Sequence, residues 1–337
     1  MTPLRYILLT TLFLLLTACA QESAAPKSTT QLRMGTLVTI TTWGVPDNIE
    51  QQAVTAGFQE IERIEQLMSR HLPNSPLSQI NGTVDSAPHP IPHEIWQVLN
   101  LGIEIDQLSQ GAFDMGLLAL TKLWGFSEEP PPTTPPAAQA INNWLKNRPS
   151  PPRIVLKEPD LLQLDPQTGL DLGAIAKGYA IDQAIATLRA QGVENAIVNA
   201  GGNLRIIGSK GGKPWRVGVQ HPRDPSRVTA VSLLSGDIAL VTSGDYERFF
   251  LFEGQRYHHI LDPKTGYPAK AGLISVSIQC PEAITADALS TAIFVLGQQK
   301  GLELINKHFP NCAALLIDDK ENHLQTEKYI GQWLTDR

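Results

Sequence analysis

Short runs in which apolar and polar residues alternate recur along the chain and predict β-strands. Residues 37–43 form a β-branched run, and residues 195–208 contain two runs around a pair of glycines. Side chains of a strand point alternately to two faces, so each run can place one apolar face against a core. The predicted strands are residues 37–43, 161–164, 195–208 (two strands), 215–220, 228–234, 238–242, 257–261 and 273–279.

Apolar residues spaced about 3.6 positions apart predict helices between these runs. The stripe is clearest in residues 49–68, where Val54, Phe58 and Ile61 share one face. Strands follow strands instead of alternating strictly with helices, which predicts an α+β fold of largely antiparallel sheets packed with helices. The other predicted helices are residues 94–108, 139–146, 285–296 and a helix that opens in residues 170–182 and ends at Gly192.

Composition narrows the class of protein. The chain has 337 residues, of which 42% are hydrophobic and 18% charged, as in an ordinary globular protein. Its net charge is −6 and it has no long basic run, which argues against nucleic acid as a partner.

The N-terminus has the pattern of an export signal. Arg5 precedes an apolar stretch, residues 6–16, and Leu16-Thr17-Ala18-Cys19 resembles a bacterial lipobox. We therefore expect a signal peptide over residues 1–18, lipid on Cys19, a flexible tether over residues 19–31 and one domain over residues 32–337. A plain signal peptide or a short anchor is the alternative.

Two cysteines, Cys280 and Cys312, remain after such processing. In an oxidising compartment they can pair or stay buried and free, and their positions in the sequence do not decide between these states.

Residues 170–182 combine Asp171, Gly173, Lys177 and Gly178 on a tight connection into a helix. The start of a helix exposes unpaired N–H groups and suits a phosphate, and glycines let a ligand approach the backbone. The stretch matches neither the Walker loop nor the three-glycine dinucleotide pattern. A turn with a solvated lysine is the alternative.

Two further groups have residue types suited to catalysis. Asp287 and Thr291 lie four residues apart on a predicted helix, so both face one way, and Ser290 adjoins them. Such oxygens suit Mg²⁺ if a carbonyl and substrate phosphates complete the set, whereas capping of the helix by Asp287 is the alternative. His258 and His259 lie in a predicted strand, so only one of them can face a site as a base.

Several motifs in a fixed order resemble the ApbE-type FAD:protein FMN transferases, which are flavin transferase lipoproteins of the bacterial envelope. The motifs extend from Met34-Gly35-Thr36 almost to the C-terminal end of the chain, and the resemblance implies an ApbE-like, T-fold-related architecture. They are Gly-Ala-Phe-Asp, Leu-Trp-Gly-Phe, Asp-Leu-Gly-Ala-Ile-Ala-Lys-Gly-Tyr, Asn-Ala-Gly-Gly-Asn, Thr-Ser-Gly-Asp-Tyr, His-Ile-Leu-Asp-Pro-Lys-Thr-Gly-Tyr-Pro and Ala-Asp-Ala-Leu-Ser-Thr-Ala.

The resemblance also implies roles for individual residues. His259 matches the proposed general base of the family, and His71 stands where many relatives have a tyrosine that stacks on the flavin. The Mg²⁺ ligands fall on the main-chain carbonyl of Ala174 and on the side chains of Asp287 and Thr291, while some relatives have Asp in place of Ser290. The implied flavin site comprises Met34, His71, Ala112, Phe113, Asp114, Asp171, Lys177 and Leu261.

The reaction implied by the resemblance is Mg²⁺-dependent transfer of the FMN moiety of FAD to a threonine or serine hydroxyl. The product is a phosphoester-linked flavoprotein, AMP leaves, and the family's acceptors are subunits of membrane redox complexes. The family favours a lipid-anchored protein of the inner membrane facing the periplasm, with the outer membrane left open. A metal-dependent FAD pyrophosphatase and a non-catalytic flavin-binding lipoprotein are the alternatives.

Overall fold

The computed structural model describes residues 25–83, 85–149, 151 and 153–334, so the expected signal peptide and Cys19 lie outside the described residues. Its centre is an eight-stranded sheet in the order β1-β2-β6-β7-β10-β13-β14-β15. Every pairing in that sheet is antiparallel. The strands are β1 (Lys27–Arg33), β2 (Thr36–Thr42), β6 (Ala196–Ala200), β7 (Asn203–Gly208), β10 (Gly236–Gly244), β13 (Leu273–Cys280), β14 (Ala313–Asp318) and β15 (His323–Gln325).

The described residues also form three small antiparallel sheets. Strands β8 and β9 pair as a hairpin beside β16, strands β11 and β12 form a second hairpin, and β5 lies between β3 and β4. Their bounds are β3 (His89–Pro90), β4 (Ile154–Lys157), β5 (Leu161–Leu164), β8 (Trp215–Gln220), β9 (Val228–Leu234), β11 (Phe249–Phe252), β12 (Gln255–His258) and β16 (Gln332–Trp333).

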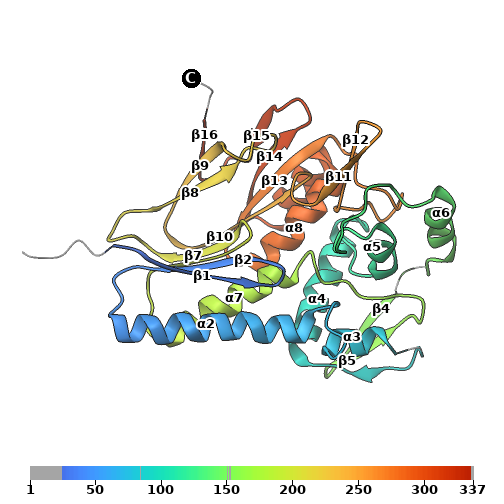
Figure 1. Cartoon of the computed structure of the whole chain (residues 1–337), viewed down its shortest axis with the longest axis horizontal. Helices are drawn as coiled ribbons and strands as arrows, with labels where there is room; N and C mark the ends of the chain where they lie inside the picture. Colours follow the sequence, from blue (N-terminus) through green and yellow to red (C-terminus); the bar gives the residue numbers. More distant parts are fainter. Residues whose placement is uncertain (1–24, 84, 150, 152, 335–337) are drawn as a thin grey trace, which may run out of the picture.

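Helices cover one face of the large sheet. Figure 1 shows α2 and α7 beneath that face and the small sheet of β8, β9 and β16 on its other side. Because both faces are covered, all residues of β13 are buried and the strand shows no burial alternation. The helices are α2 (Asp47–Met68), α3 (Pro76–Asn81), α4 (His93–Leu108), α5 (Leu118–Trp124), α6 (Ala138–Asn147), α7 (Ala176–Ala190), α8 (Ala283–Leu296) and α9 (Gln298–His308).

The structure confirms the predicted α+β class with antiparallel sheets, and it corrects two details. Residues 27–31, expected in the flexible tether, form most of β1. Its polar side chains show no apolar alternation, so the sequence pattern did not predict a strand. Ser28 and Thr30 pair with Thr41 and Thr39 of β2 through hydroxyl contacts of 2.8 and 2.9 Å. The strand predicted over residues 257–261 ends at His258 instead.

No helix among the described residues is long and apolar enough to cross a membrane.

A disulfide joins Cys280, at the end of β13, to Cys312, which precedes β14. It closes a segment with a sequence separation of 32 that contains α8 and α9. A cross-link of this span stabilises a fold by about 3–4 kcal/mol, mainly by restricting the unfolded chain.

We therefore expect the double variant Cys280→Ser, Cys312→Ser to lose about 3–4 kcal/mol of unfolding free energy. Urea unfolding of the oxidised protein, the reduced protein and the variant measures this loss. The reduced protein and the variant should agree. Identical midpoints for all three would show that the cross-link does not constrain the chain.

Candidate active site

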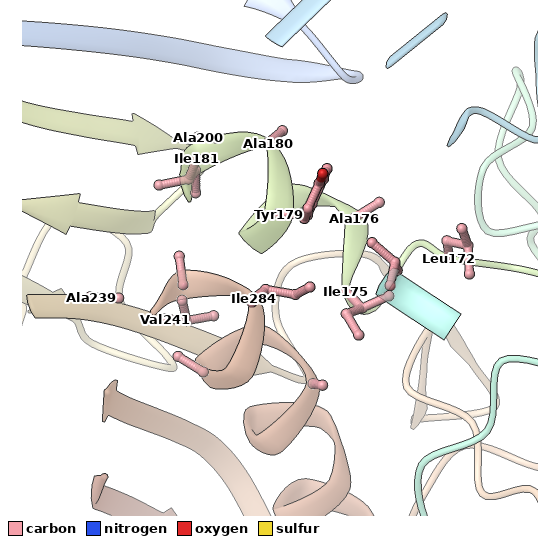
Figure 2. Close-up of a cluster of buried hydrophobic side chains, with 14 of the residues drawn as sticks. Leu172, Ile175, Ala176, Tyr179, Ala180, Ile181, Ala200, Ala239, Val241 and Ile284 are labelled. Atoms are coloured by element: carbon pink, nitrogen blue, oxygen red, sulfur yellow. The ribbon is translucent and has the colours of Figure 1, made fainter. Parts of the chain in front are cut away.

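Helices α7 and α8 touch through their backbones at Gly178. A Cβ at this position would lie 2.4 Å from the carbonyl oxygen of Ala283, so any larger residue would push the helices apart. Ile175, Tyr179 and Ile284 belong to the buried cluster around this contact (Figure 2). Gly178 therefore serves close helix packing. Gly178 and Lys177, which were predicted on the connection before the helix, both lie in the first turn of α7.

The buried carboxylate of Asp287 faces the first turn of α7. Its Oδ2 accepts a hydrogen bond of 2.9 Å from the Gly178 amide, and its Oδ1 accepts one of 3.0 Å from Nδ2 of Asn203. Burial raises the pKa of Asp287, while the positive charge of Lys177 acts in the opposite direction. Asp287 is the fifth residue of α8, so it does not cap its own helix, and that alternative is wrong. It caps α7 instead.

Oxygen atoms suited to a hard cation surround this carboxylate. The Gly178 amide donates to Asp287 and not to the Ala174 carbonyl four residues earlier. The Ala174 carbonyl therefore lacks the amide donor that a continuous helix would supply. Thr291 is half-buried, and its hydroxyl lies 3.5 Å from that of Ser243. Carboxylate, carbonyl and hydroxyl oxygens form a set that fits Mg²⁺.

Only one acidic group contributes to this set. No three His, Cys, Asp or Glu side chains among the described residues gather into a metal site. Ser290 is fully buried, with its hydroxyl 2.8 Å from that of Ser243 and donating to the Asp287 carbonyl at 2.9 Å. Ser290 therefore supports the local packing. A cation at Asp287 would take its remaining ligands from neutral oxygens of the protein and from oxygens of a bound ligand.

Arg70 and Arg248 form a basic cluster near Asp171. Arg70 Nε lies 3.1 Å from Asp171 Oδ2, while Asp171 Oδ1 accepts a bond of 3.0 Å from the Gly173 amide. Arg70 and Arg248 both donate to the hydroxyl of Ser127, at 3.2 and 3.3 Å. Two guanidinium groups therefore meet at one hydroxyl, and guanidinium groups suit an anionic ligand.

The turn of the β1–β2 hairpin reaches this basic cluster. Met34 and Gly35 both have positive φ, of 50° and 68°. A guanidinium nitrogen of Arg248 lies 3.7 Å from the position of a Cβ on Gly35. His71 is exposed and lies near the same charges. The partial burial of its ring lowers its pKa, and the positive charge of Arg70 lowers it further. Met34, His71 and Asp171 therefore lie near the charges of Arg70 and Arg248.

His259 contributes a neutral imidazole to the same region. Burial lowers its pKa to about 3, and the charges of Lys177 and Arg248 act in the same direction. Its backbone amide donates to the Arg248 carbonyl at 3.0 Å, while its buried Nδ1 has no partner among the described residues. His259 is therefore neutral at physiological pH, so one of its ring nitrogens keeps a lone pair that can accept a hydrogen bond from a hydroxyl group.

The two neighbouring histidines have different surroundings. His258 is 6% exposed, its Nε2 lies 3.1 Å from the Ala269 carbonyl oxygen, and its ring meets that of Phe294 edge-on at 5.4 Å. It therefore packs against α8.

The remaining predicted flavin residues are buried and paired within the protein. Ala112 and Phe113 are 4% and 1% exposed, and Leu261 is 5% exposed. The carboxylate of Asp114 forms ion pairs with Arg148 and Arg153, and it accepts a bond of 2.7 Å from the Gly116 amide. The Asp171 amide donates to the Met115 carbonyl at 2.8 Å, which connects this segment to the basic cluster.

Sequence reasoning missed Arg70, Ser127 and Arg248, because their association depends on contacts 57 and 121 residues apart in sequence. Asn203 lay in a glycine-rich motif, but nothing in that motif indicated that it holds Asp287.

The sequence pattern of the ApbE family matches residues 34–316. The chain belongs to the ApbE family. A relative from Treponema pallidum (strain Nichols), named FAD:protein FMN transferase, is 34% identical over 305 residues, which is 86% of this chain and 84% of the relative. A protein of the same name from Vibrio cholerae (serotype O1, strain O395) is 32% identical over 262 residues, 77% of this chain and 78% of the relative.

Solved structures of the ApbE family have the same fold. The crystal structure of the ApbE protein from Thermotoga maritima matches with a TM-score of 0.80 and 32% identity, covering 90% of this chain and 97% of that one. The flavin transferase ApbE from Vibrio cholerae matches with a TM-score of 0.79 and 28% identity, covering 90% and 97%. The ApbE resemblance and the ApbE-like architecture expected from the sequence are therefore confirmed.

Proposed function

We propose that this chain is an FAD:protein FMN transferase that uses Mg²⁺ and attaches FMN through a phosphoester to a threonine or serine hydroxyl of a partner protein. The buried Asp287 carboxylate of α8 supports this most directly, because it faces the first turn of α7 and lies near the charge of Lys177. Relatives of that name at 34% and 32% identity support the same activity.

In this proposal, two groups of residues hold the FAD pyrophosphate. Lys177, Arg70 and Arg248 bind the phosphate oxygens and offset their charge. Asp287, Thr291 and the Ala174 carbonyl hold Mg²⁺, which supplies Lewis-acid stabilisation of charge on the phosphates when bound. The exposed ring of His71 offers a stacking face to the isoalloxazine.

His259 is the proposed general base. The hydroxyl oxygen of the acceptor forms a bond to the FMN-side phosphorus, the bond from that phosphorus to the bridging oxygen breaks, and AMP leaves with that oxygen. The neutral imidazole of His259 accepts the hydroxyl proton.

Incubation of the protein with FAD, Mg²⁺ and a candidate acceptor domain tests this function. Mass spectrometry should find the acceptor heavier by one FMN moiety, and an acceptor with its target threonine changed to alanine is the control. Rapid AMP and FMN release without label on any acceptor would instead indicate the pyrophosphatase, and intact FAD would indicate a non-catalytic flavin-binding protein.

We also propose that the protein is anchored by lipid on Cys19 and faces the periplasm, where its acceptors are subunits of membrane redox complexes. The lipobox in residues 16–19 supports the anchor. A Cys19→Ser variant should leave the membrane fraction and keep its transferase activity, because Cys19 is not among the proposed site residues. Cell fractionation with a turnover assay measures both, and unchanged membrane association would contradict lipid anchoring at Cys19.

A further inference from the structure

Neither α7 nor α8 has a capping side chain of its own. Ile175 precedes α7 and Glu282 precedes α8, and neither side chain accepts a bond from the first turn of its helix. Both helix starts are buried, so their free N–H groups need acceptors from elsewhere.

Asp182 of α7 supplies those acceptors to α8. Its Oδ1 accepts from the Ala283 amide and its Oδ2 from the Ile284 amide, each at 2.9 Å. Arg205 of β7 donates to Oδ1 at 2.7 Å and holds the carboxylate in place. The first two amides of α8 therefore end on one buried side chain of α7.

Asp287 of α8 makes the reciprocal contact, because it accepts from Gly178 in the first turn of α7. Asp182 follows Gly178 by four residues on α7, and Asp287 follows Ala283 by four on α8, so each carboxylate lies one turn into its own helix and bonds the start of the other. The close approach at Gly178 leaves little room for either helix to shift without the other.

We propose that Asp182 is a positioning residue, which fixes the start of α8 and thereby holds the Asp287 carboxylate at the first turn of α7. Asp182 touches neither the substrate nor the metal of the proposed function. It acts through one turn of α8. Only the metal readout below rests on the proposed function.

Asp182→Asn is the sharpest test, because it keeps the shape of the side chain and replaces one accepting oxygen with an NH₂ group. Hydrogen exchange followed by NMR should find the Ala283 and Ile284 amides exchanging about 10- to 100-fold faster. The Gly178 amide, which Asp182 does not touch, should also exchange several-fold faster because its acceptor Asp287 has moved. Wild-type protection at Gly178 would overturn the proposal, since Asp182 would then be only a local cap.

Asp237→Asn is the matched control. The substitution removes the same charge and another partner of Arg205, whose Nε lies 2.9 Å from Asp237 Oδ1. Asp237 is exposed, and its side chain bonds only Arg205 and Arg189 among the described residues. Its Gly178 exchange should stay as in the wild type. Equal acceleration in both variants would attribute the effect to general destabilisation and overturn the role of Asp182.

Ala283→Pro provides a second route if Asp182→Asn folds poorly. Proline is favoured at the first position of a helix, and Glu282 already has the extended backbone, φ −120° and ψ 138°, that a residue before proline adopts. The change removes one bond to Asp182 from the α8 side and should also accelerate Gly178 exchange. Unchanged exchange in this folded variant would contradict the proposal.

Titration with Mn²⁺ in the presence of FAD, followed by electron paramagnetic resonance, extends the test to the metal. We expect Asp182→Asn to raise the Kd for Mn²⁺ about 10- to 100-fold, as the loss of a supporting residue commonly does, and Asp237→Asn to leave it unchanged. An unchanged Kd in Asp182→Asn would overturn the positioning role at the metal. A wild-type protein that binds Mn²⁺ but never transfers FMN would refute the proposed function alone.

Discussion

Replacing Asp287 by alanine is expected to abolish FMN transfer at any Mg²⁺ concentration. Asp287 provides the single carboxylate of the proposed metal site, because the other ligands, the Ala174 carbonyl and the Thr291 hydroxyl, are uncharged. The substitution also leaves the Gly178 amide and the Asn203 side chain without their acceptor. A buried donor without a partner costs about 1–3 kcal/mol, so the variant should be less stable as well.

Asp287→Asn separates the charge from the hydrogen bonds. Its amide keeps the shape and one acceptor, so it should retain more stability than Asp287→Ala while remaining nearly inactive. Turnover as a function of Mg²⁺ concentration, with thermal unfolding on the same samples, measures both effects. Near-wild-type turnover of either variant at modest Mg²⁺ would mean that the metal binds elsewhere.

The sequence predicted features that depend on local pattern. The alternation of β8 is reproduced residue by residue, with Trp215, Val217 and Val219 buried and the residues between them exposed. The apolar stripe of α2 is also buried as predicted. In both elements, one face meets a core and the other meets water, and this difference is visible in the sequence.

Features that depend on contacts distant in sequence were not predictable in this way. The bond from Gly178 to Asp287 spans 109 residues, and no local pattern indicates that one helix caps another. The sequence predicted a tether over most of β1 because this strand is polar. It is stabilised by pairing with β2 and not by buried apolar residues. The family motifs named most site residues, but the structure was needed to group Arg70 and Arg248 around them.

The low pKa of His259 has a consequence for acid stability. Below about pH 6.5, the reference value, the unfolded chain binds a proton at this residue that the folded protein does not bind. Stability should therefore fall as the pH drops from about 6.5 towards the folded pKa of about 3. Urea unfolding at pH 5 and pH 8 should give a smaller difference for His259→Ala than for the wild type, and an equal difference would contradict the low pKa.

His259→Ala is expected to slow FMN transfer by about 10²- to 10⁴-fold, the usual effect of losing a general base, and to leave FAD and Mg²⁺ binding nearly intact. Burial lowers the pKa of His259, and the charges of Lys177 and Arg248 lower it further. A base that is already neutral above about pH 4 should give no acid limb near pH 6.5 in the rate profile.

His258→Ala is the matched control, because it removes an identical side chain at the adjacent position. Its ring packs against Phe294 and its Nε2 contacts the Ala269 carbonyl, so the variant should unfold at a lower temperature but turn over at close to the wild-type rate once folded. Strand β12 ends at His258, so backbone alternation does not by itself separate the two rings; their different contacts do. Single-turnover transfer with FAD binding measured in parallel gives the ranking, and a reversed ranking would show that His259 is not the base.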